Sequence, residues 1–225
     1  MVSGNRLRGL ILAMLSILTL VASQARLSTA QQAPRETIDG DPQAWKEVVN
    51  AYANLTRAGS FRVLKSGSGG RNAHMWEVVR NPIRLHLVVA ETGQELIAVG
   101  SQTALGPGRW ICASSSNLAA FAIGQLIYRY TPVLPPLGDR LPSLSTLQRD
   151  IVIARQADVT IGGEKTSVYK YSVRLPSENI RERLFVLENG LPRRVEVLDS
   201  VENTIETVDF QDYGAAIVIT MPVCQ

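Results

Sequence analysis

The sequence contains few of the residues that enzymes and metal sites usually need. Histidine occurs only at His74 and His86, and cysteine only at Cys112 and Cys224. Neither histidine stands at metal-ligand spacing from a cysteine, so no metal site is expected. No Gly-x-Ser-x-Gly segment is present, and two histidines leave few candidates for a general base. We therefore expect no metal or other cofactor, and we expect that the protein is not an enzyme.

The acidic residues do not indicate a reaction either. Glu178, Glu182, Glu188 and Glu196 interleave with arginines, a pattern typical of a solvated sheet face with cross-strand ion pairs. A pair of catalytic carboxylates of the glycosidase kind stays open, although nothing singles out two of them. His86 alternates with apolar neighbours, which indicates a strand histidine that faces solvent.

Acidic residues are missing from the first thirty positions, which carry an uncharged apolar run, Leu10–Val21. Arg6 and Arg8 precede this run, and small-residue cleavage sites end at Ala25 and Ala30. These features predict a secretory signal peptide over residues 1–30, because the run is short for a membrane span. An uncleaved signal anchor is the alternative.

Removing the signal peptide changes the charge and sets the cysteine chemistry. Residues 1–30 hold three of the 23 basic residues and no acid, which leaves 20 basic against 20 acidic residues. This balance gives no argument for nucleic acid as a partner. No cysteine precedes Cys112, so we expect a periplasmic or secreted, soluble protein without a lipid anchor. An even cysteine count in an exported protein favours a Cys112–Cys224 disulfide, and two free thiols are the alternative.

The mature chain is expected to be one domain that begins with a helix. Residues 31–40 are polar and predict a flexible leader before a single domain at 41–225. Asp41 and Pro42 suit the cap and first position of a helix, and Gly59 suits its end. Between them, Trp45, Val48, Tyr52 and Leu55 form an apolar stripe at helical spacing.

After Ser60 the apolar period changes from 3.6 to 2, which predicts about ten strands. The strongest turn signals are Gly162-Gly163 and Asn189-Gly190-Leu191-Pro192, with Pro192 opening the outgoing strand. Ile83, Leu85, Leu87 and Val89 should share one strand face, with Arg84 and His86 on the other. Two further strands, at Thr204–Phe210 and Ala215–Met221, should complete the sheet. Together these elements predict an α+β fold dominated by a curved antiparallel sheet.

The middle of the chain interrupts the strand pattern. Residues 117–130 predict a second, unusually apolar helix, which is either core or a lid over an apolar cavity. A proline-rich loop follows at 131–138 with Val133, Leu134 and Leu137. Apolar side chains in a loop indicate contact with a core, a ligand or a partner.

The order of these elements resembles the LolA/LppX type of bacterial envelope protein. The resemblance rests on the helix ending Leu55-Thr56-Arg57-Ala58-Gly59-Ser60-Phe61, the Asn189–Pro192 hairpin and the closing Asp212–Pro222 stretch. It implies a strongly curved antiparallel sheet, an unclosed half-barrel whose concave face is covered by helices. Members of that family carry lipid or lipoprotein acyl chains between the sheet and the helices, and one relative is an envelope-stress regulator.

The resemblance implies a function and a candidate site. We expect an exported protein that binds or carries a lipid or lipoprotein acyl chain without covalent chemistry, and whose further partner is an envelope lipoprotein or a membrane protein. The alternative is an envelope sensor or assembly module that binds a protein partner through the concave face. The candidate apolar cavity is lined by Leu85, Leu87, Val89, Leu118, Phe121, Leu126, Val133, Leu134 and Leu137.

Overall fold

The computed structural model describes residues 36–67, 74–90, 92–107, 109–114, 149–174 and 179–224. The expected signal peptide, the second helix at 117–130 and the loop at 131–138 lie outside these residues. Within them, no helix has the length and apolarity needed to cross a bilayer.

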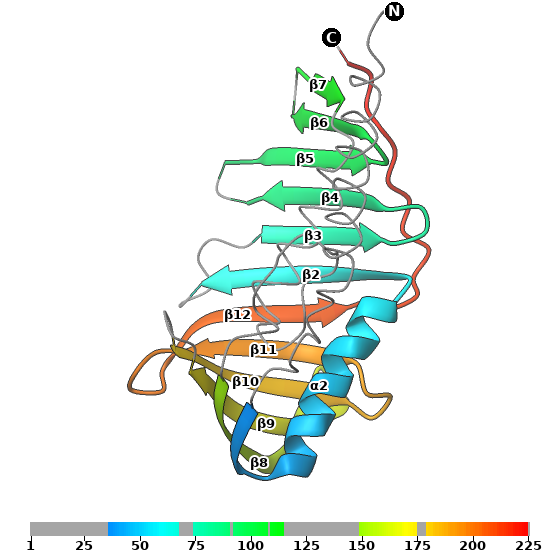
Figure 1. Ribbon diagram of the computed structural model, residues 1–225. Coiled ribbons are helices and arrows are strands. Elements are labelled where there is room, and N and C mark those ends of the chain that lie inside the picture. Colours follow the sequence, from blue (N-terminus) through cyan, green and yellow to red (C-terminus); the bar gives the residue numbers. More distant parts are fainter. Residues whose placement is uncertain are drawn as a thin grey trace, which may run out of the picture.

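The described residues form one twelve-stranded sheet and one helix (Figure 1). The sheet order is β1-β8-β9-β10-β11-β12-β2-β3-β4-β5-β6-β7, so two antiparallel meanders, β2–β7 and β8–β12, meet where β12 pairs with β2. The strands are β1 (Glu36–Gly40), β2 (Ser60–Gly67), β3 (His74–Val79), β4 (Arg84–Val89), β5 (Gln94–Val99), β6 (Gln102–Gly106), β7 (Ile111–Ser114), β8 (Arg149–Ile161), β9 (Glu164–Arg174), β10 (Asn179–Leu187), β11 (Pro192–Leu198) and β12 (Thr204–Gln211). This large, unclosed sheet confirms the expected α+β half-barrel.

The prediction of a flexible leader over 31–40 is wrong for residues 36–40. They form β1, which pairs in parallel with β8 at the edge of the sheet. Ile38 packs against the core, and Gly40 has a φ of 111°, which suits glycine. Polar composition misled the prediction, because an edge strand buries only one of its faces.

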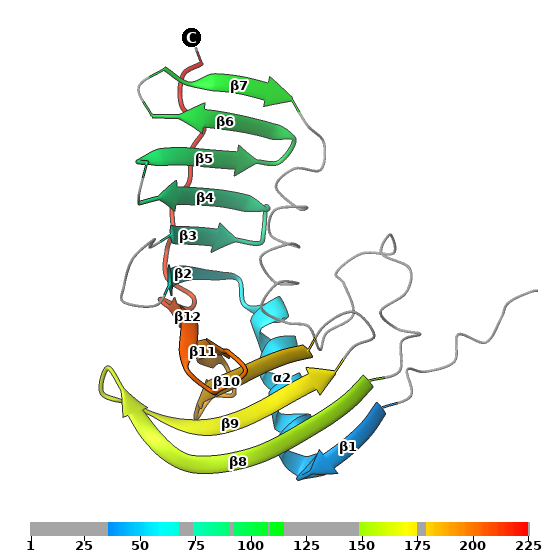
Figure 2. The same ribbon diagram turned by 90° about the vertical axis from the view of Figure 1, so that its left-hand side faces the viewer.

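The expected helix is confirmed as α2 (Pro42–Arg57). Asp41 caps it: its side chain accepts a hydrogen bond from the Gln43 amide at 2.8 Å, and Pro42 takes the first helical position. The stripe Trp45, Val48, Tyr52 and Leu55 is buried. The helix contacts β8 and β11, and Figure 2 shows β8 and β9 bending around it, so α2 lies on the concave side of the sheet.

The β10–β11 hairpin is confirmed, although its turn is not the primed turn with two positive φ values that Asn-Gly pairs favour. Four residues, 188–191, separate the strands, and the Leu187 amide donates to the Leu191 carbonyl at 2.9 Å. Gly190 has a φ of 77°, whereas Asn189 keeps a negative φ, so the turn uses one left-handed residue rather than two. Pro192 opens β11 as expected. Gly162 and Gly163 form the predicted β8–β9 turn, both with positive φ.

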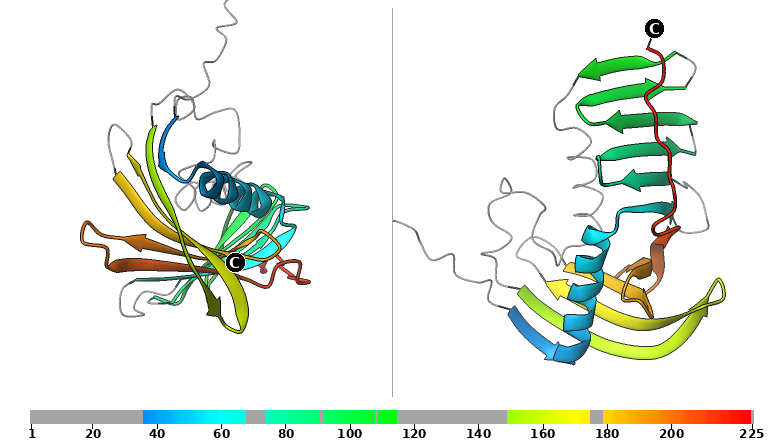
Figure 3. Two further views of the ribbon diagram at one scale, coloured as in Figure 1. Left: turned by 90° about the horizontal axis from the view of Figure 1, so that it is seen from below. Right: turned by 90° about the vertical axis from the view of Figure 1, so that its right-hand side faces the viewer.

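The expected last strand, Ala215–Met221, is wrong, because residues 212–224 join no ladder. We call them the C-terminal segment. Ile217 and Ile219 are buried while Val218 is 78% exposed, so strand-like alternation is present without a strand partner. The segment runs across β2–β7 towards β7 (Figures 1 and 3). Single contacts hold its start instead of a ladder: the Gly214 amide donates to the Ser60 carbonyl at 3.0 Å, and the Ser60 hydroxyl donates to the Ala215 carbonyl at 2.7 Å.

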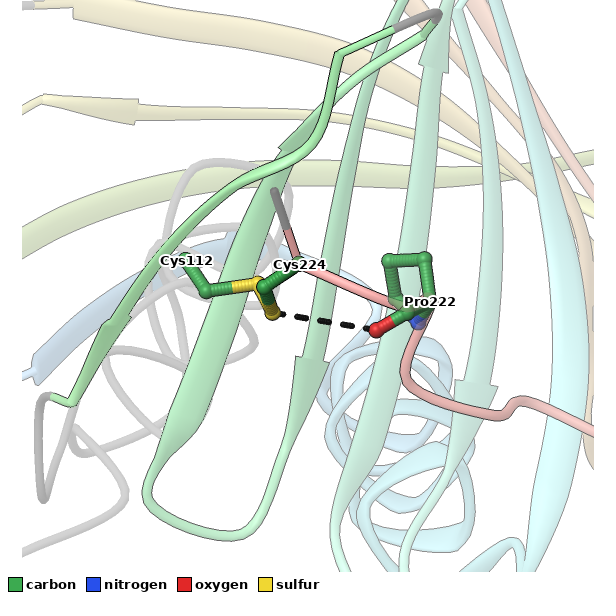
Figure 4. The surroundings of a disulfide bond; sticks show 3 residues. All are labelled: Cys112, Pro222 and Cys224. Carbon is green, nitrogen blue, oxygen red and sulfur yellow. Dashed lines mark hydrogen bonds between the residues drawn. A yellow bond between two sulfur atoms is a disulfide. The ribbon is translucent and has the colours of Figure 1, made fainter.

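The expected Cys112–Cys224 disulfide is confirmed and fastens the end of the C-terminal segment to β7 (Figure 4). The two Cα atoms are 5.7 Å apart, within the usual disulfide range. The sequence separation is 112 residues, so the bridge closes a long loop.

Candidate functional site

The two faces of the sheet differ in chemistry, and the strand register identifies them. Residues directly opposed in an antiparallel ladder share a face. We call the inner face the one on which α2 packs; it carries Phe61, Val78, Leu85 and Ala98, which are opposed in turn on β2, β3, β4 and β5 and are fully buried. The outer face is the opposite one.

A second apolar row on the inner face is only partly covered. It crosses β3–β7 in register through Trp76, Leu87, Leu96, Leu105 and Ile111. The first three are half-buried, whereas Leu105 is 54% and Ile111 66% exposed. This row carries no charged side chain. It is therefore an apolar surface that extends from the core toward the β7 edge.

The structure places three of the predicted cavity residues on this face. Leu85 is fully buried, and Leu87 and Val89 are half-buried in the same strand, β4. The other six lie outside the described residues: Leu118, Phe121, Leu126, Val133, Leu134 and Leu137. Of the predicted cavity, the structure therefore describes only three residues of β4, which lie in or beside the partly covered row.

Charged side chains of β2–β5 form a network on the outer face. Arg62 contacts Glu77 and Asp212, each at 2.8 Å. His86 lies between two carboxylates, with Nδ1 3.1 Å from Glu77 and Nε2 2.9 Å from Glu95. His86 was expected to face solvent, and it does lie on the outer face. Its side chain is only 20% exposed, however, because it contacts the two carboxylates.

Glu182 differs from the expected solvated carboxylate, because it is buried on the inner face with 1% exposure. Its carboxyl accepts a hydrogen bond from the Tyr171 hydroxyl and one from the Tyr52 hydroxyl at 3.4 Å. The two tyrosine hydroxyls are 2.8 Å apart. Burial raises the pKa of Glu182 to about 8, although the tyrosine hydrogen bonds act in the opposite direction. Glu196, in contrast, pairs with Arg183 on the outer face at 2.6 Å, as expected.

This cluster of the two tyrosines and Glu182 beneath α2 was not predicted from the sequence. The only signal for it is which residues of β10 alternate in step with Glu182. Glu182 alternates in step with Leu184 and Val186, both buried. Arg181 and Arg183 alternate on the other side of the strand. An alternation count along β10 would have placed Glu182 inside.

Two described hollows lie on the outer face rather than the inner one. Their volumes are about 260 and 220 Å³, and they share Val152 and Ser172 on β8 and β9. Lys170, Arg181 and Glu202 line the first, and Lys170 pairs with Glu202 at 2.5 Å. Their mixed charge does not suit an apolar ligand. Among the described residues there is also no group of three metal-binding side chains.

Comparison with known proteins identifies the fold. No protein-family model and no curated protein matches the sequence. Among solved structures, the Mycobacterium tuberculosis lipoprotein LppX matches with a TM-score of 0.54 and 13% identity, over 80% of this chain and 100% of LppX. LprF from Mycobacterium bovis matches with a TM-score of 0.54 and 11% identity, over 84% of this chain and 99% of LprF.

MucB also matches, with a TM-score of 0.48 and 18% identity, over 80% of this chain and 62% of MucB. The LppX and LprF matches confirm the LolA-like fold that the sequence predicts. At these identities the likeness defines the fold alone.

Proposed function

We propose that this LolA-like half-barrel binds a lipid or the acyl chain of a lipoprotein on its inner face, outside the cytoplasm, and catalyses no reaction. The partly covered row from Trp76 to Ile111 supports the proposal most directly. It offers a continuous uncharged surface of five apolar side chains, and its exposure rises to 66% at Ile111. An acyl chain laid along this row would bury methylene groups worth about 0.8 kcal/mol each.

The signal peptide expected at residues 1–30 and the disulfide favour an extracytoplasmic site of action. The ion-pair network lies on the outer face, and so do the contacts of the C-terminal segment with Ser60, Arg84 and Cys112, which leaves the inner face of β3–β7 for an apolar ligand. A protein partner that binds through the same inner face is the competing proposal, and the experiment below distinguishes the two.

The test compares two apolar residues of similar exposure on opposite faces. Leu105 on the inner face is 54% exposed, and Ile205, out of phase with the buried Val208, is 48% exposed on the outer face. Native mass spectrometry would measure binding of monopalmitoylglycerol to the disulfide-intact protein. Leu105→Gln should weaken binding by roughly tenfold or more, since two or three methylene contacts worth about 0.8 kcal/mol each are lost. Ile205→Gln should leave it unchanged.

Lipid that co-purifies with the protein and is released by solvent extraction would support the same conclusion. If no lipid co-purifies and neither variant alters binding, the lipid proposal fails. Binding of a protein through the inner face, weakened by Leu105→Gln, would then favour the interaction module.

A further inference from the structure

Two buried side-chain nitrogens on the inner face have no hydrogen-bond partner. In the described part of the chain, five buried side-chain nitrogens are unpartnered. Three belong to Arg80, Arg84 and Arg183, whose guanidinium groups bond through another nitrogen. The other two are His74 Nδ1 and Trp76 Nε1. Leaving such a group unpaired costs folding free energy, so each needs an explanation.

The two nitrogens belong to one place on the sheet. His74 and Trp76 are two residues apart on β3, so their side chains share the inner face. Trp76 is opposed by Val63 and Leu87, both apolar. His74 is opposed by Lys65 and Val89. His74 and Trp76 therefore form a polar site, which we call the polar node, within the apolar surface. It lies at the β3 end of the partly covered row.

The donor set indicates which chemical group fits this node. The indole nitrogen of Trp76 can only donate, and Nδ1 of His74 donates in one tautomer. The Lys65 ammonium, at the position opposed to His74, lies 2.8 Å from the Glu206 carboxylate. A carboxylate ligand beside this pair would therefore also meet the Glu206 carboxylate, which disfavours it. A neutral carbonyl oxygen accepts from such donors without adding charge.

We infer that the inner face recognises the acyl carbonyl of an ester- or amide-linked lipid at His74 and Trp76, with the chain along Leu87, Leu96 and Leu105. This inference rests on the proposed function and specifies its ligand class. The same carbonyl occurs in acylglycerols and in the acyl groups of lipoproteins, so the node does not separate those two sources. It does separate acyl lipids from pure hydrocarbon and ether chains.

The experiment compares two ligands that differ only at the carbonyl. Monopalmitoylglycerol is an ester, and hexadecylglycerol is its ether analogue with no carbonyl oxygen. The wild-type protein should bind the ester about threefold to tenfold more tightly, the range of one hydrogen bond between neutral groups. Trp76→Phe keeps most of the apolar ring but removes the N–H. It should abolish the preference for the ester while changing ether binding little.

Two further variants keep the test decisive. His74→Leu should reduce the ester preference through the second nitrogen. Trp110→Phe, a change of the same kind at a half-buried site on the β6–β7 connection, should retain the full preference. Unfolding midpoints in urea would show that each variant remains folded.

The outcomes separate this inference from the function on which it rests. Equal wild-type affinity for ester and ether, or an unchanged preference in Trp76→Phe, overturns the carbonyl assignment and leaves lipid binding standing. If neither ligand binds, the proposed function fails and the inference fails with it. A soluble ester such as triacetin competing with the ether would add support, because the carbonyl node would then bind without a chain. Comparing the affinity for monopalmitoylglycerol with the affinity for a synthetic diacylated lipopeptide would show whether acylglycerols or lipoproteins supply the carbonyl.

Discussion

Tyr171 and Glu182 lie opposite each other on β9 and β10, and the tyrosine hydroxyl donates a hydrogen bond to the buried carboxyl beneath helix α2. Tyr52 on the helix contacts both groups, so this cluster joins the helix to the sheet. Burial raises the pKa of the Tyr171 hydroxyl as well as that of the Glu182 carboxyl. In the described structure no cation bonds to either group.

Stability should therefore fall as the pH rises. The folded protein keeps the Glu182 proton up to a pKa of about 8, whereas the unfolded chain loses it near 4.5. Between these values the folded state binds more protons, so the free energy of unfolding decreases with pH, by at most about 1.4 kcal/mol per unit. Urea unfolding at a series of pH values would measure this slope.

Glu182→Gln should flatten the slope, because the amide has no proton to lose. The control is Glu196→Gln, which changes a half-buried glutamate on the outer face and should keep the wild-type slope apart from the loss of its Arg183 contact. A Glu182→Gln variant with an unchanged slope would mean that another group causes the pH dependence.

Removing the disulfide should loosen the C-terminal segment. Cys112→Ser with Cys224→Ser should lower the free energy of unfolding by about 2–4 kcal/mol, less than the full loop-entropy value because the segment keeps its contacts to Ser60 and Arg84. Hydrogen exchange should rise in residues 215–224. Reductant should destabilise the wild type and leave the double variant unaffected; an effect on both would contradict this assignment.

Gly40 should tolerate no side chain. An added Cβ would lie 1.9 Å from the Ile153 carbonyl oxygen, at a φ of 111°. Gly40→Ala should therefore cost more than 3 kcal/mol or release β1 from β8. Gly163→Ala is the matched change, because its φ is 87° but nothing lies within 4 Å. It should cost about 1 kcal/mol. Similar unfolding midpoints for the two variants would show that β1 adapts freely.

The cap of α2 gives a smaller, well-defined effect. Asp41→Ala should destabilise the protein by about 1 kcal/mol, since the Gln43 amide loses its side-chain acceptor. Asp39→Ala, an exposed change two residues earlier in β1, is the control and should alter the unfolding midpoint little. Equal losses in the two variants would point to the strand rather than the cap.

Local pattern predicted the elements of this fold better than their pairing. The α2 stripe and the β10–β11 hairpin follow from spacing and turn chemistry, which depend on neighbouring residues. The parallel contact of β1 with β8 joins segments more than a hundred residues apart, and no local pattern encodes it. Ala215–Met221 alternates like a strand but pairs with no described strand. Alternation of apolar residues indicates which side chains are buried, not whether the backbone is paired.

For the candidate site, too, the sequence predicted what depends on local alternation and not what depends on contacts between distant residues. Alternation correctly put Leu85, Leu87 and Val89 on one face of β4, whereas Ile83, predicted with them, precedes the strand and is 39% exposed. It could not reveal the polar node at His74 and Trp76, since an unpaired nitrogen is recognised only when all its neighbours are known. The buried Glu182 required the phase of β10 to be compared with that of its neighbours.

The position of β12 between β11 and β2 has a consequence for how the chain matures. During synthesis the β2–β7 meander is complete long before its β2 side has a neighbour, because the strand that fills that gap, β12, follows all the other described strands in the sequence. Until then two unpaired strand borders are open to pairing with other chains. A nascent chain, or one cut before Thr204, should therefore aggregate readily, and pairing of β12 should remove this tendency.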